Sequence, residues 1–295
     1  MADEASGEQP RANAGLSKAW NTILYDKFLQ WEPLLTTGLG QHGTRLVDSH
    51  PPAAGSSVLD VGCGWGDTTA VLAKLVGAEG KVVGVDIAPR FIEQARERYP
   101  GCTFEVKDVE YESELGGPYD AVYARFGTMF FVNPVKGFKN MAGCLKPGGQ
   151  MHIVVWRKRQ DNPTFYTAQQ VAERHIAEED KSKDEVTCGP GPFANAGADM
   201  MSDILMKAGF SDVNFCRFDA PMQMGRSVDE AVTFTTTMGP AGESIRLAEA
   251  KSGEAAGAKR KQIEEELRAE YVPLDKPGEG VWMNSSTWII TATKK

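Results

Sequence analysis

The stretch VLDVGCGWGDTT, residues 58–69, contains the pattern that decides the fold. Its first four residues predict a short buried strand, and a helix is expected to begin at Asp67. Three glycines, Gly62, Gly64 and Gly66, lie between them and permit a tight turn with close approach of the backbone to a ligand. The helix that follows offers free N–H groups and a positive end. The stretch therefore predicts a cofactor-binding turn, without choosing the cofactor.

Two details of this turn narrow the choice of cofactor. The glycine spacing is GxGxG, whereas the dinucleotide-binding fingerprint is GxGxxG. Asp60 stands two residues before the first glycine, at the end of the predicted strand. A carboxylate there would repel a pyrophosphate, but it suits a ligand that carries an ammonium and a sulfonium group. The charge argument favours S-adenosylmethionine over a phosphate-bearing cofactor.

Outward from this turn, strand and helix patterns alternate. The sequence predicts further strands at 81–85, 103–106, 119–123 and 151–156, with helices at 67–76, 89–98 and 134–145. Strands separated by helices of this length imply a parallel sheet with helices on both faces. Helical segments are expected over 16–49, and later strands over 212–218 and 287–293.

Polar residues stand where the predicted strands end. Asp86 ends the second strand and can accept hydrogen bonds from two ribose hydroxyls, although an isolated aspartate there could equally be a helix cap. Asp108 ends the third strand, where an adenine amino group would lie, or it simply forms a turn. Arg125 and Phe126 follow the fourth strand and face the carboxyl edge of the sheet, where open parallel sheets bind ligands.

Taken together, DVGCGWG, GVDIA, KDVE, YDAVYARFG and LKPGGQMHIVVW within residues 56–156 resemble the class I S-adenosylmethionine-dependent methyltransferase family. Within it, the chain is most similar to the ubiquinone/menaquinone-biosynthesis-like small-molecule branch. The resemblance implies an α/β fold, a Rossmann-like three-layer α/β/α sandwich. Its seven-stranded sheet would be mostly parallel, with the last strand antiparallel.

The resemblance also implies a domain organisation. Residues 16–295 would form a single methyltransferase domain with a cofactor-binding core at 56–156. A helical cap would come from 16–49, 157–200 and 225–286, and residues 1–15 are expected to be a disordered lead-in.

The same resemblance implies roles for individual residues. Asp86 would hold the ribose, Ile87 would lie against the adenine, and Arg125 would lie beside the methionine moiety. Asp108 would contact the adenine amino group, and the Val109 N–H a ring nitrogen. The residues expected around the methionine part are Asp60, Gly62, Cys63, Gly64, Trp65 and Gly66, where the bulky Trp65 either shapes the acceptor side or covers the cofactor.

Methyl transfer mainly needs alignment and exclusion of water, and a base is required only when the acceptor must lose a proton. His175, on a helical face with Ala168 and Val171, is the best candidate for such a base, against its being an ordinary histidine. No histidine has metal-ligand spacing, so no metal site is predicted. The side chains expected in an apolar acceptor pocket, unless they only pack the core, are Met129, Phe130, Phe131 and Phe165.

Composition limits the partners. The 295 residues carry a net charge of -8, and the basic footprint of a nucleic-acid binder is missing. No apolar run reaches the roughly 18 residues of a membrane span, and the first residues lack the apolar part of a signal peptide. Five scattered cysteines indicate reduced thiols, which is typical of a cytoplasmic protein.

The expected function is methyl transfer from S-adenosylmethionine to an O, N or C nucleophile of a small, partly apolar metabolite. A non-catalytic S-adenosylmethionine-binding module and a nicotinamide-dependent oxidoreductase are the alternatives. The sequence does not specify the acceptor or the oligomeric state.

Overall fold

A single mixed sheet runs through the computed structural model, which describes residues 11–176, 190–252 and 254–295. Its strand order is β3-β2-β1-β4-β5-β8-β6. The strands are β1 (Ser57–Val61), β2 (Lys81–Asp86), β3 (Thr103–Val106), β4 (Tyr119–Arg125), β5 (Leu145–Trp156), β6 (Phe210–Gly225) and β8 (Gly280–Lys294). β1 to β5 are parallel, and β8 is antiparallel to both of its neighbours. This confirms the predicted seven strands with an antiparallel last strand, to which the two-residue β7 (Asp275–Lys276) adds a short pairing with β8.

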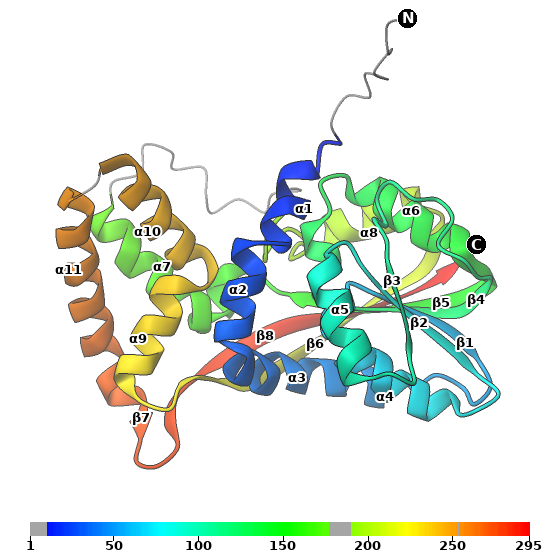
Figure 1. The fold of residues 1–295 in the computed structure, drawn as a ribbon, viewed down its shortest axis with the longest axis horizontal. Coiled ribbons are helices and arrows are strands. Elements are labelled where there is room, and N and C mark those ends of the chain that lie inside the picture. Colours follow the sequence, from blue (N-terminus) through cyan, green and yellow to red (C-terminus); the bar gives the residue numbers. More distant parts are fainter. Residues whose placement is uncertain (1–10, 177–189, 253) are drawn as a thin grey trace, which may run out of the picture.

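Helices cover both faces of this sheet and make three layers. In Figure 1, α3 (Glu32–Ser49) and α4 (Asp67–Val76) lie along one side of the sheet, and α6 (Pro134–Cys144) and α8 (Ala198–Lys207) along the other. α5 (Pro89–Arg98) packs on β2 and β3. The central strands are buried on both faces, which is why segments such as Val58–Val61 and Ile153–Trp156 are almost continuously apolar.

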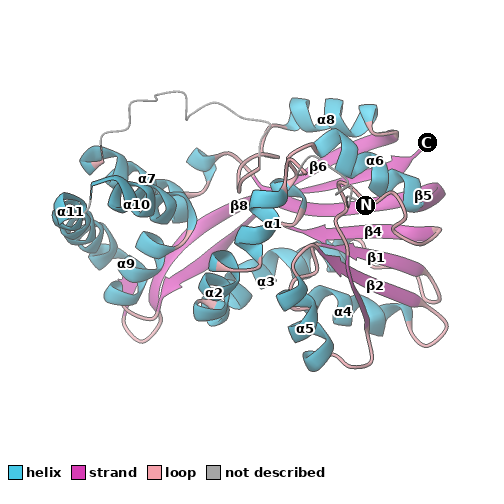
Figure 2. Ribbon diagram, turned by 45° about the horizontal axis from the view of Figure 1, so that its top comes forward, coloured by secondary structure: helices cyan, strands magenta, loops and turns pink. Residues whose placement is uncertain are grey.

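A group of helices gathers beyond one end of the sheet. β6 and β8 extend past the other strands as a long antiparallel pair, and they lead to α7 (Pro163–His175), α9 (Val228–Thr237), α10 (Gly239–Ser252) and α11 (Glu254–Tyr271) (Figures 1 and 2). Short 3₁₀ turns occur at Thr128–Phe130, Arg159–Asp161 and Val272–Leu274. The prediction that the helical cap extends to residue 286 is wrong, because 280–286 belong to β8. There, Val281 to Ser286 pair with β6 and most of these side chains are buried.

The predicted disordered lead-in also needs correction at its end. Residues 1–10 lie outside the described residues, but α1 (Ala14–Trp20) begins within the predicted segment and is followed by α2 (Ile23–Gln30). Asn13 is buried, and its side-chain amide donates to Asp108 at 3.0 Å and to Glu110 at 3.3 Å. These hydrogen bonds satisfy its polar group and hold the chain against the loop after β3. Among the helices described, none is both long and apolar enough to cross a membrane.

Candidate active site

A cavity of about 830 Å³ opens at the carboxyl ends of the parallel strands. The segments after β1, β2, β3 and β4 line one half of it, and α1 and α2 contribute to its wall. The other half is lined by residues of α7, α9, α10 and the loop 190–194. This is the edge at which open α/β sheets bind ligands. The two halves are continuous, so a cofactor on the sheet and a second molecule under the helices could meet.

The glycine turn has one face toward this cavity. Gly62 and Gly64 line it with φ of +68° and +53°, values that side-chain-bearing residues rarely adopt. A β-carbon on Gly62 would lie 2.9 Å from the α-carbon of Gly127, so the two loops touch through their backbones. Around Gly64, the nearest atom to such a carbon is a ring carbon of Phe91 at 4.0 Å, which leaves this position open toward a ligand.

Gly66 has a different role from the predicted one. It does not line the cavity. With φ of +87° it is the residue that precedes the first turn of α4, and an added β-carbon would lie 2.6 Å from the buried ring of Phe104. Gly66 is therefore required for packing between α4 and the sheet. The prediction that it contacts the cofactor is corrected accordingly.

Asp60 is likewise placed behind the turn. It is 1% exposed, it does not line the cavity, and it accepts a hydrogen bond of 2.6 Å from the Thr69 hydroxyl on α4. Burial raises the pKa of Asp60 to about 6, although the Thr69 hydrogen bond and the Arg125 charge oppose this rise. Its position corrects the expectation of direct contact with a cofactor, because the carboxylate ties β1 to the start of α4.

Asp86 lines the cavity, as predicted, and also braces the glycine turn. One carboxylate oxygen accepts the Gly64 N–H at 3.0 Å and the other accepts the Ala88 N–H at 3.0 Å. Burial raises the pKa of Asp86, while these backbone N–H groups lower it. A carboxylate has about four acceptor positions, so two remain for ligand hydroxyls. Ile87, next to it, also lines the cavity.

Asp108 and Val109 form the corner beside Ile87, and both line the cavity. One oxygen of Asp108 accepts the Asn13 amide and, at 3.4 Å, the Arg11 guanidinium. Its other oxygen accepts the Glu110 N–H at 3.1 Å. The segment that precedes α1 therefore covers this corner of the cavity.

Arg125 reaches the cavity from the end of β4, with its guanidinium 3.5 Å from the Asp67 carboxylate. The next residue, Phe126, has φ of +62°, which is strained for a side-chain-bearing residue. This conformation sets the Phe126 ring against Trp156, with ring centroids 4.5 Å apart, and both rings line the cavity. The position of Phe126 at this edge was expected from the sequence, but that of Trp156 was missed. Trp156, like Asp86 and Arg125, stands at a strand end.

Cys63 and Trp65 also line the cavity, as predicted. Burial raises the pKa of the Cys63 thiol well above its usual range, so the group stays protonated and is a poor nucleophile. The Trp65 ring packs against Phe91 and Phe28, with centroids 5.5 and 6.4 Å away. Its indole N–H is buried and has no acceptor among the described residues.

The predicted apolar side chains are found at the cavity. Met129, Phe130, Phe131 and Phe165 all line it, and so does Phe193. Phe193 and Phe165 make an edge contact with centroids 5.9 Å apart. The loop that carries Phe193 is held by a hydrogen bond from the Gly191 N–H to the Met129 carbonyl.

The structure places His175 away from the cavity. It lies at the end of α7, where its Nε2 is 2.6 Å from the Glu266 carboxylate of α11. His175 does lie on a helix, as expected, but its side chain faces α11 rather than the cavity. We therefore withdraw His175 as a candidate base. Within the described ranges, no group of three or more His, Cys, Asp or Glu side chains is placed to hold a metal ion.

Comparison with known proteins agrees with this geometry. Residues 58–149 match the model of a family described as a methyltransferase domain. This match to a methyltransferase domain covers about a third of the chain. It is 34% identical over 114 residues to the aklanonic acid methyltransferase DauC of Streptomyces sp. strain C5, covering 37% of this chain and 52% of that protein. It is 36% identical over 97 residues to the demethylmenaquinone methyltransferase of Chlorobaculum parvum, covering 33% and 39%. The chain thus spans about half or less of these relatives.

Solved structures share the fold. The YcgJ protein of Bacillus subtilis superposes with a TM-score of 0.54 at 15% identity, covering 86% of this chain and 99% of that one. Phosphoethanolamine N-methyltransferase 2 of Haemonchus contortus, solved with S-adenosyl-L-methionine, gives 0.54 at 17% identity, covering 94% and 59%. These likenesses confirm the Rossmann-like architecture of the methyltransferase domain.

Proposed function

We propose that this chain is an enzyme that transfers a methyl group from S-adenosylmethionine to an O, N or C nucleophile of a small, partly apolar metabolite. One observation carries the proposal. A single cavity joins the glycine turn and Asp86 to a space walled by aromatic rings, including Phe126 and Trp156. The similarity to aklanonic acid and demethylmenaquinone methyltransferases supports a small-molecule acceptor.

The lining residues fit S-adenosylmethionine. Asp86 has acceptor positions left for the ribose hydroxyls, and Gly64 leaves room for close approach. The buried Trp65 indole N–H has no acceptor among residues 11–176, 190–252 and 254–295, so a polar atom of a ligand would satisfy it. Ile87 and Val109 offer apolar contact to the adenine, beside Asp108.

S-Adenosylmethionine supplies a methyl group that is already electrophilic, so the chain's own task is alignment and exclusion of water. Trp20 of α1 packs edge-on against Phe130, with centroids 4.8 Å apart, and closes the wall over the glycine turn. Among the lining carboxylates, Glu243 is paired with Arg246, which holds its pKa below the usual range and makes it a weak base. We therefore assign the rate enhancement to positioning.

We also propose a division of the chain into a core and a cap, an acceptor other than nucleic acid, and a cytoplasmic location. The division into a cofactor core at 56–156 and a cap is supported by the two halves of the cavity lining. A net charge of -8 supports an acceptor other than nucleic acid, and the scattered cysteines support a cytoplasmic location.

The test is formation of S-adenosylhomocysteine by the purified chain, supplied with S-adenosylmethionine and pooled metabolites. The pools include demethylmenaquinone and aklanonic acid, the acceptors in the names of similar proteins. We expect one pool to stimulate product formation, and Gly64→Val to abolish it while the protein stays folded. Cofactor binding without stimulation by any pool would instead indicate a binding module without catalysis.

A further inference from the structure

The half of the cavity lined by α7, α9, α10 and the loop 190–194 is here called the acceptor half. It combines aromatic walls with a positively charged side chain. Its walls include Trp156, Phe165, Phe193 and Phe234, and Arg159 lies among them. The Arg159 guanidinium carbon lies 5.7 Å from the centre of the Phe193 ring. A cation in such a setting is costly unless a partner compensates the water it has lost.

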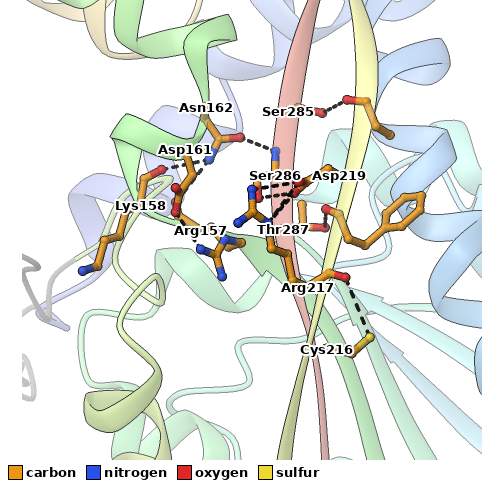
Figure 3. A network of polar contacts seen from close by, with 12 residues as sticks. Arg157, Lys158, Asp161, Asn162, Cys216, Arg217, Asp219, Ser285, Ser286 and Thr287 are labelled. Carbon is orange, nitrogen blue, oxygen red and sulfur yellow. Dashed lines mark hydrogen bonds and ion pairs between the residues drawn. The ribbon is translucent and has the colours of Figure 1, made fainter.

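The position of Arg159 is fixed by the turn that carries it. Arg157 and Asp161 form an ion pair of 3.0 Å across this turn. The fully buried Asn162 donates its side-chain amide to the carbonyls of Arg157 and Lys158, and its oxygen accepts the Ser286 N–H of β8 at 2.7 Å (Figure 3). The turn is thus tied to the long strand pair, and the base of the Arg159 side chain is held in place.

The Arg159 guanidinium has no partner within the described residues. Its Nη1 is buried and makes no hydrogen bond, and its side chain forms no ion pair with any carboxylate of residues 11–176, 190–252 and 254–295. Its neighbour Arg157, by contrast, is paired with Asp161 and stacks on Trp288 at 4.0 Å. Since an unsatisfied buried donor of this kind costs free energy, an acceptor brought by a ligand is the natural compensation.

Other charges in the acceptor half leave it positive. Glu243 is occupied by two hydrogen bonds from Arg246, of 2.8 and 2.6 Å. Lys27 of α2 lines the cavity where its two halves meet, close enough to Glu243 and Arg246 for their charges to act on it, and its pKa is lowered mainly by burial. Among the described lining residues of this half, Glu243 is the carboxylate and Arg159, Arg246 and Lys27 are the cations. The net charge of the whole chain is -8, so this local excess of positive charge is opposite in sign to the net charge of the protein.

We propose that Arg159 binds a carboxylate of the methyl acceptor and thereby selects acids over their neutral analogues. This inference rests on the proposed function only where it identifies the ligand as the methyl acceptor. The expected binding of a carboxylate by Arg159 does not depend on that function. A guanidinium matches the planar geometry of a carboxylate, and the aromatic walls suit an apolar body attached to it. A monoanion fits an unpaired guanidinium in an apolar setting better than a phosphate dianion, whose transfer from water costs more.

The probes are 2-naphthoate and 2-naphthamide, which share an apolar body and differ in charge. Binding of each is measured by calorimetry, with and without S-adenosylhomocysteine, to the wild-type chain and to Arg159→Gln, Arg159→Lys and Lys158→Gln. Lys158 is the matched control, because it is an exposed cation one position away that does not line the cavity. We expect the wild type to prefer the carboxylate by about tenfold.

Arg159→Gln should remove this preference while affinity for 2-naphthamide changes by less than about threefold, as expected when only the charged contact is lost. Arg159→Lys should keep part of it, and Lys158→Gln all of it. Equal or undetectable binding of the two probes by the wild type, or a preference that survives in Arg159→Gln, overturns the proposal. Failure of S-adenosylhomocysteine to bind would refute the proposed function instead, and the titrations without it would still decide the role of Arg159.

Discussion

Replacement of Gly66 by alanine separates packing from ligand binding in the glycine turn. The new methyl carbon would lie 2.6 Å from the ring of Phe104, which is 3% exposed, and 3.2 Å from the methyl group of Ala95. A side-chain-bearing residue at φ of +87° costs about 1–2 kcal/mol, and overpacking of a buried site costs about 1–3 kcal/mol. We therefore expect Gly66→Ala to lower the free energy of unfolding by about 2–5 kcal/mol.

Gly64→Ala is the matched comparison two residues away. It meets only the Phe91 ring at 4.0 Å, and φ there is +53°, so the expected loss of stability is about 1 kcal/mol. Its methyl group faces the cavity, and we expect affinity for S-adenosylhomocysteine to fall at least about tenfold. Urea unfolding followed by tryptophan fluorescence, with calorimetric titration of each variant, gives both quantities. Equal stability of the two variants, or full affinity in Gly64→Ala, would refute this division of roles.

Three further outcomes are expected. Asp86→Asn should weaken S-adenosylhomocysteine binding by about 2 kcal/mol in calorimetry, since charge-assisted hydrogen bonds are lost. The surface variant Asp120→Asn, which removes another strand carboxylate bonded to a backbone N–H, should leave affinity unchanged. Burial lowers the pKa of His42 to about 4, so the folded state resists its protonation and stability falls as pH drops from 6.5 toward 4. In urea titrations at pH 7.5 and 4.5, His42→Gln should remove roughly 2–3 kcal/mol of this fall in stability. Asp60, with its pKa raised to about 6, stabilises the folded state as pH falls, and this contribution is the same in the wild type and the variant. His175→Gln should leave product formation within about twofold, because the residue lies outside the cavity; a loss of a hundredfold or more would restore it as a base.

The parts of the fold set by local pattern could be predicted from sequence. The strand at Val58–Val61, the turn after it and the strand ending at Asp86 each depend on neighbours within a few residues, and all three are found. The cavity-facing positions of Gly64 and Asp86 follow from topology, because the carboxyl ends of parallel strands share one edge.

What the sequence could not provide depends on contacts between distant segments. Gly66 looks like Gly62 in sequence, and only the Phe104 ring, brought by β3, shows that it is a packing glycine. His175 lies on a plausible helical face, but Glu266 of α11 occupies it, 91 residues away along the chain. Such pairings are set by tertiary packing and leave no mark in the local pattern.

The same limit explains the segments at the cap and the N-terminus. Residues 280–286 follow a helical region, and their strand character comes from pairing with β6 rather than from a clear alternation of their own. Asn13 lies in a polar stretch that has the composition of a disordered segment, yet Asp108 and Glu110 offer it buried acceptors. In both cases a partner elsewhere in the chain overrides the local propensity.

The most direct test of the central claim is a calorimetric titration of the wild-type chain with S-adenosylhomocysteine and, separately, with NADH. The cavity geometry predicts saturable binding of S-adenosylhomocysteine at one site per chain and no saturable binding of NADH, since the GxGxG turn and the aspartates beside it disfavour a pyrophosphate. Saturable binding of NADH, with none of S-adenosylhomocysteine, would contradict the account.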